Sequence, residues 1–105
     1  MNTENNDLGP DEFAAAFKNR PDAVLIDVRT PEEFESGHLP GAININVQGS
    51  DFHEQVDDLD PMKPYFVYCK AGARSSAAMR YMLAQGFNDV HNLVGGIMAW
   101  NGEIA

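Results

Sequence analysis

The chain has 105 residues, of which 44% are hydrophobic and 22% charged, and its formal net charge is −9. This composition is typical of a globular protein, so we expect one domain over residues 1–105, with residues 1–7 disordered. The single cysteine excludes an internal disulfide and a cysteine-based zinc cluster. The acidic balance argues against nucleic acid or an anionic membrane as partner, and no apolar run reaches the roughly 20 residues that span a bilayer.

The first seven residues contain neither the basic region nor the apolar region of a secretory signal, so a cytoplasmic location is expected. The cations are concentrated elsewhere, between residues 61 and 88, where there is no Asp or Glu. This segment holds four of the seven cations: Lys63, Lys70, Arg74 and Arg80. It also holds the only cysteine, Cys69. Such clustering arises by chance in some short chains; the functional interpretation is a site for a small anion.

The first half of the chain predicts two helices and two strands. Pro10–Asn19 begins with proline and two acids and has two phenylalanines four residues apart, which indicates a helix. Ala23–Val28 is almost continuously apolar, as in a strand buried on both faces. Thr30 is followed by proline and two acids, the pattern of a capped helix start. Ala42–Val47 alternates in polarity and predicts a brief strand.

The second half continues the alternation of helices and strands. Residues 51–59 are expected to hold a helix, and the aromatic run Tyr65–Tyr68 a strand. Ser75–Gln85 has an apolar stripe at helical spacing, Val90–Val94 is a last strand, and Ile97–Trp100 follows two glycines as a short helix. This order predicts an α/β fold: an open, mostly parallel sheet of about four to five strands with helices on both faces.

Ligands of such sheets bind outside the carboxyl ends of the strands, and Cys69 stands at one of these ends. A loop of small residues follows it and leads into the next helix. Backbone N–H groups of a compact loop can turn inward as an anion-binding nest, and the helix adds its positive amino end. We expect Ser75 or Ser76 to cap that helix. The residues that follow Cys69 into this helix are Lys70, Ala71, Gly72, Ala73, Arg74 and Ser75, and the resemblance given below implies that they bind the substrate.

A thiol in this position has a defined chemistry. Helix amino ends and nearby cations lower a cysteine pKa from about 8.5 to roughly 3.5–7.5, and the thiolate is the nucleophile. The alternative is a buried cysteine that acts as a small hydrophobic residue, as many free cysteines do. The cations that follow Cys69, Lys70 and Arg74, favour the reactive thiol.

The chain resembles a single-domain rhodanese, a thiosulfate sulfurtransferase-type module, over about residues 25–100. The segments that carry the resemblance are Leu25 to Arg29, Glu32 to Phe34, Gly37 to Asn44, Cys69 to Ser75 and Leu93 to Trp100. Each motif alone is weak, but the whole set in this order is specific. The resemblance implies a rhodanese-like fold.

The resemblance also implies the chemistry of sulfur transfer. Cys69 would take sulfur from a small anionic donor such as thiosulfate, carry it as a persulfide, and pass it to cyanide or a thiol. The N–H groups of residues 70–75 would hold the sulfur and the departing oxyanion, Arg74 would close the loop, and Lys70 would attract the donor. A protein sulfur donor or acceptor fits equally well. No metal or organic cofactor is implied.

Two other functions compete with this one. A sulfur-relay or sensing module, loaded by a protein partner and turning over little by itself, fits the same cysteine. A cysteine phosphatase is disfavoured, because its loop places five residues between Cys and Arg, whereas four separate Cys69 from Arg74.

Several further residues invite a functional interpretation, but a structural one is expected for each. His38 is expected to pack or to hydrogen-bond, and Asp27 and Arg29 to form an ion pair that steadies a neighbouring loop. The glutamates after Pro31 are expected to form a solvated helix face: Glu32, Glu33 and Glu35. The residues expected to close the core are Phe34, Met98 and Trp100.

Overall fold

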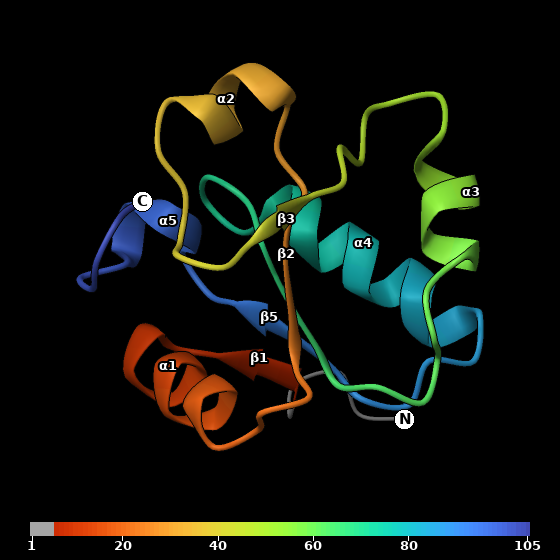
Figure 1. Ribbon diagram of the computed structural model, residues 1–105, viewed down its shortest axis with the longest axis horizontal. Helices are drawn as coiled ribbons and strands as arrows, with labels where there is room; N and C mark the ends of the chain where they lie inside the picture. The colour runs from red at the N-terminus through yellow and green to blue at the C-terminus, as the bar shows by residue number, and fades with distance from the viewer. Residues whose placement is uncertain (1–5) are drawn as a thin grey trace.

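The computed structural model describes residues 6–105 (Figure 1). The strands are β1 (Asp7–Leu8), β2 (Val24–Asp27), β3 (Ile43–Asn44), β4 (Tyr65–Tyr68) and β5 (Val90–Leu93). The helices are α1 (Pro10–Lys18), α2 (Pro31–Glu35), α3 (Phe52–Asp57), α4 (Ala73–Ala84) and α5 (Gly96–Ala99). Within the described part of the chain, every helix is too short or too polar to cross a membrane.

The five strands form one sheet in the order β1-β5-β4-β2-β3, and every pair of neighbours is parallel. β4 is central, with β2 on one side and β5 on the other. Asp27 at the end of β2 is in register with Tyr68 at the end of β4. The chain therefore leaves both strands at the same edge of the sheet, and the segments that follow them meet there.

Helices cover both faces of the sheet, as the alternating sequence predicted. Figure 1 shows α3 and α4 on one side of the sheet and α1 and α5 on the other. The core beneath α3 and α4 includes Ile26, Val28, Phe52, Val56, Val67, Ala78, Met79 and Met82. The core beneath α1 and α5 includes Phe13, Leu25, Leu39, Phe66, Tyr68 and Leu93. Every residue of β4 is buried, because both faces of the central strand are covered.

The two-residue period of β4 decides where Cys69 points. Side chains alternate between the faces of a strand, so Phe66 and Tyr68 join the α1 side, and Val67 and Cys69 join the α4 side. The Cys69 side chain therefore faces the amino end of α4, the helix that begins at Ala73.

Most predicted elements are confirmed, with shorter bounds. The strand expected over residues 42–47 pairs only at Ile43–Asn44. The disorder expected at residues 1–7 is wrong for Asp7, which pairs with Asn92 in β1; residues 1–5 lie outside the described part. The helix expected from Ser75 starts two residues earlier and has no side-chain cap, since Gly72, at φ +113°, precedes it. A left-handed glycine lets the loop enter the helix abruptly.

The ion pair expected between Asp27 and Arg29 is confirmed, and it is buried. Asp27 is 0% and Arg29 5% exposed, and Arg29 Nη2 lies 2.6 Å from Asp27 Oδ2. The same nitrogen donates to the carbonyl oxygen of Gly37 at 2.7 Å. The backbone carbonyl of Arg29 accepts a hydrogen bond from the side-chain amide of Asn44 at 2.9 Å. The pair thus ties the end of β2 to the segment between α2 and β3.

Removing one partner of this pair leaves an unpaired charge in the core. We expect Asp27→Ala to lower the free energy of unfolding by about 3–5 kcal/mol, measured by urea denaturation. Arg20→Ala is the control, because the Arg20–Asp89 pair is exposed, and it should cost about 1 kcal/mol or less. Equal small losses for the two variants would contradict the role given to the buried pair.

Candidate active site

Cys69 directly follows the central strand, and the loop of residues 70–72 connects it to α4. The residue is 1% exposed and packs with the α4-side core. Lys70, Ala71 and Ala73 around it are exposed. The thiol therefore lies just beneath a surface loop.

The loop directs hydrogen-bond donors at the sulfur. The Gly72 N–H donates to Cys69 Sγ at 3.0 Å, and the Ser75 hydroxyl lies 3.3 Å from the same atom. Burial alone would raise the pKa of Cys69, but the Ser75 hydroxyl and the amides of Ser75, Gly72 and Ala71 outweigh it. The pKa of this thiol therefore falls below its ordinary value, because these donors favour the charged form.

Ser75 connects the sulfur to a buried polar chain. Its hydroxyl also lies 2.5 Å from Asn92 Oδ1 and 3.2 Å from the Gly72 carbonyl, and the Asn92 amide donates to Asp7 at 3.1 Å. Ser75 is 0% and Asn92 4% exposed. No sequence motif pointed to Asn92; the available signal was an asparagine inside the last predicted strand, because a polar group buried there needs a partner.

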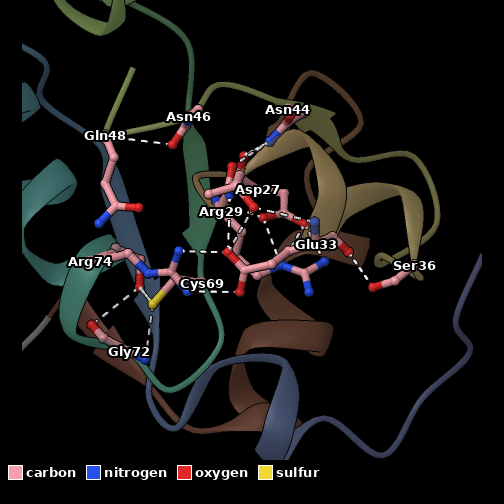
Figure 2. A network of polar contacts seen from close by, with 12 residues as sticks. Asp27, Arg29, Glu33, Ser36, Asn44, Asn46, Gln48, Cys69, Gly72 and Arg74 are labelled. Carbon is pink, nitrogen blue, oxygen red and sulfur yellow. Dashed lines mark hydrogen bonds and ion pairs between the residues drawn. The ribbon is translucent and has the colours of Figure 1, made fainter. Parts of the chain in front are cut away.

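Arg74 extends from the start of α4 to Glu33 of α2, as Figure 2 shows. Two hydrogen bonds join the guanidinium and the carboxylate, at 2.7 and 3.0 Å. The carboxylate also accepts from the Thr30 N–H at 3.1 Å, completing a capping box at the start of α2. The expectation that Glu33 belongs to a solvated face is therefore wrong. Arg74 and Thr30 hold the pKa of Glu33 at about 2.

The parallel sheet explains why Glu33 and Arg74 meet. α2 starts four residues after the end of β2, and α4 starts five residues after the end of β4. Since these neighbouring strands end at the same edge, the first turns of the two helices lie close together. The positive charge of Arg74 near Cys69 is thus already paired with a carboxylate.

The predicted site residues are brought together only in part. Gly72, Ser75 and the Ala71 amide face the thiol, whereas Arg74 binds Glu33 and Lys70 is exposed. Among residues 6–105, no three His, Cys, Asp or Glu side chains are grouped so as to hold a metal ion.

Several residues outside the loop were expected to have structural roles. His38 stacks on Phe34, with ring centroids 3.8 Å apart, and its Nδ1 lies 3.0 Å from the Phe34 carbonyl oxygen, which confirms the expected packing. Trp100 packs edge-on against Phe13 at 6.3 Å, also as expected. Met98 is 70% exposed and does not close the core. Phe34 is half-buried and lies outside both core clusters.

Comparison with known proteins identifies the family. The model of the rhodanese-like domain matches residues 9–103. This chain belongs to the rhodanese-like family. It is 41% identical to thiosulfate sulfurtransferase GlpE of Pseudomonas syringae, over 87% of this chain and 83% of that protein. A solved rhodanese-related protein from Thermoplasma volcanium has a TM-score of 0.81 and 27% identity, covering 94% of this chain and 96% of that one.

A relative of different activity contains a similar region. The chain is 37% identical to a tRNA uridine(34) hydroxylase of Cytophaga hutchinsonii, over 91% of this chain but 31% of that protein. This chain therefore corresponds to only part of that longer protein. The relatives named as sulfurtransferases support sulfur-group transfer as the general activity of this chain.

The ion pair between Glu33 and Arg74 predicts a pH-dependent contribution to stability. The pKa of Glu33 is about 2 in the fold, against an ordinary 4.5. A depressed carboxyl pKa stabilises the fold above pH 4.5, and this contribution is lost as the pH falls toward 2. Glu33→Gln should therefore cost about 1 kcal/mol of unfolding free energy at pH 7, and the difference should vanish in acid.

Urea denaturation of the Glu33→Gln protein and the parent over a pH series checks this. Glu35→Gln is the control, because Glu35 lies in the same helix and is exposed; its effect should be small at every pH. A cost of Glu33→Gln that stays constant down to about pH 2 would contradict the depressed pKa.

Proposed function

We propose that the protein is a thiosulfate sulfurtransferase that works through a persulfide on Cys69. The Cys69 thiolate attacks the outer sulfur of thiosulfate. The bond from Sγ to that sulfur forms while the sulfur–sulfur bond of thiosulfate breaks, and sulfite leaves with the electron pair. A thiolate monoanion and a thiosulfate dianion thus give a persulfide monoanion and a sulfite dianion. Persulfidation is one of the reversible states of a cysteine thiolate.

The second half of the reaction returns the thiolate. A nucleophilic acceptor attacks the terminal sulfur of the persulfide and takes it, and the bond to Sγ breaks with its electrons returning to Cys69. With cyanide the product is thiocyanate; with a thiolate it is a new persulfide. No additional oxidant or reductant is needed.

The observation that carries the proposal is the donor set around Sγ. The Gly72 amide and the Ser75 hydroxyl lie within hydrogen-bond distance of the sulfur. Donors fixed in advance where negative charge is held stabilise the thiolate, which supports Cys69 as the nucleophile. An ordinary core cysteine has no need of such partners.

In this proposal Arg74 attracts the anionic donor less strongly than an unpaired cation would. Its charge is paired with Glu33, at 2.7 Å, so it offers thiosulfate a partly neutralised partner. Cys69 is 1% exposed, and thiosulfate must displace part of the cover to reach it. The exposed cation Lys70 next to the thiol is the group we assign to the first encounter with the anion.

Intact mass spectrometry tests the persulfide. The protein treated with thiosulfate should gain one sulfur atom, cyanide should remove it, and Cys69→Ser should gain none. Thiocyanate formation from thiosulfate and cyanide should be lost in Cys69→Ser, with unchanged urea denaturation as the control for folding.

Other outcomes separate the competing functions. No gain from thiosulfate, but a gain from a protein that carries a persulfide, would favour the sulfur-relay module. A Cys69→Ser protein that forms thiocyanate at the parent rate would contradict the mechanism altogether.

Arg74→Ala should weaken the use of the anionic donor. The substitution removes the cation and leaves the Glu33 carboxylate without its ion-pair partner, so both the KM for thiosulfate and the pKa of Cys69 should rise. We expect a KM increase of about tenfold, equivalent to about 1.4 kcal/mol. Arg80→Ala is the control, since Arg80 lies on the same helix and donates a hydrogen bond to the Ser76 hydroxyl at the surface. Equal effects of the two variants would contradict a local role for Arg74.

A further inference from the structure

Two glycines at the start of α5 have left-handed backbones: Gly95, which precedes the helix, at φ +82°, and Gly96, its first residue, at φ +63°. The turn brings the amino end of α5 against the backbone that follows β4. A Cβ atom on Gly96 would lie 2.3 Å from the carbonyl oxygen of Lys70 and 2.6 Å from that of Cys69. Real Cβ atoms do not come this close to backbone oxygens, so only glycine permits the approach.

The amides of α5 use this approach to hold two carbonyls. The Ile97 N–H donates to the Cys69 carbonyl at 2.9 Å, and the Met98 N–H donates to the Lys70 carbonyl at 3.1 Å. In a trans peptide, the C=O and the N–H point in opposite directions, and the described residues contain no cis peptide bond. With these carbonyls directed at α5, the N–H groups of Lys70 and Ala71 must point away from α5.

The sulfur lies on the side to which these amides turn. Ile97 of α5 packs with the α1-side core, whereas the Cys69 side chain packs with the α4-side core. The Ala71 amide is also among the groups that favour the Cys69 thiolate. The Met98 N–H is therefore bonded to the same Lys70–Ala71 peptide unit whose N–H points away from α5, toward the side on which the sulfur lies.

We propose that the amino end of α5, consisting of Gly96 and the amides of Ile97 and Met98, is a clamp that positions the loop after Cys69. Gly96 is a positioning residue: it touches no reacting atom, but it allows α5 to hold the Cys69 and Lys70 carbonyls and so keeps the loop amides directed at Sγ. The clamp rests on the proposed role of Cys69 and adds the element that prepares this residue for reaction.

The test compares two glycine-to-alanine variants with the same kind of backbone strain. Gly96→Ala places a Cβ against the carbonyls of Lys70 and Cys69. Gly86→Ala also carries a positive φ, +98°, but its Cβ meets nothing within 4 Å, and Gly86 lies beyond the far end of α4. Neither substitution alters the charged groups near the thiol: Lys70, Arg74 and Glu33.

The readout is the pH midpoint for alkylation of Cys69 by iodoacetamide. In Gly96→Ala the midpoint should rise by about one pH unit, as expected when one amide hydrogen bond to a thiolate is lost. Gly86→Ala should keep the parent midpoint. A folded Gly96→Ala protein with the parent midpoint would overturn the clamp.

A second measurement on the parent protein covers the case in which Gly96→Ala does not fold. The NMR signals of the Met98 and Gly72 amides should both shift with the midpoint of Cys69 ionisation, because the Met98 bond is polarised through the Lys70–Ala71 peptide unit. A Gly72 signal that titrates beside a Met98 signal that does not would overturn the clamp. Neither readout requires sulfur transfer, so a failure to react with thiosulfate would refute the proposed function and leave this inference standing.

Discussion

The hydrogen bond from the Gly72 amide to Cys69 Sγ, 3.0 Å long, sets the main constraint on this structure. The Gly72 N–H faces the sulfur, and the carbonyls of Cys69 and Lys70, which face α5, need hydrogen-bond donors elsewhere. The fold satisfies both needs at the end of its central strand. Gly72, with a positive φ, closes the loop into α4, and the amides of α5 donate to the carbonyls of Cys69 and Lys70.

The charged groups around the thiol are also arranged by the fold. The protein is strongly acidic, at −9, and the cation beside the thiol is itself paired with Glu33. The groups that favour the charged form of the sulfur are first the Ser75 hydroxyl and then the backbone amides of Ser75, Gly72 and Ala71. Such donors are uncharged and permanently oriented, so they favour the anion in any protonation state of the surrounding protein.

The sequence predicted the fold class and the position of Cys69 between a strand and a helix, because both depend on local patterns. Buried strands are visible in the sequence as apolar runs. The loop after Cys69 is a single continuous stretch of small residues, so it too can be recognised from the sequence alone. The sequence did not predict the partners of the loop. Glu33 looks like its neighbours Glu32 and Glu35 in the sequence, and only the parallel register of β2 and β4 brings it to Arg74. Asn92 and Gly96 reach the loop from β5 and α5, through contacts that no local spacing encodes.

The most direct test of this account is the ionisation of Cys69 itself. Ultraviolet absorbance of the thiolate can be followed against pH, with the Cys69→Ser protein as the blank. The account predicts a midpoint below the value of about 8.5 that is ordinary for a free cysteine. A midpoint at or above that value would mean that burial outweighs the inward-facing amides, and it would contradict the account.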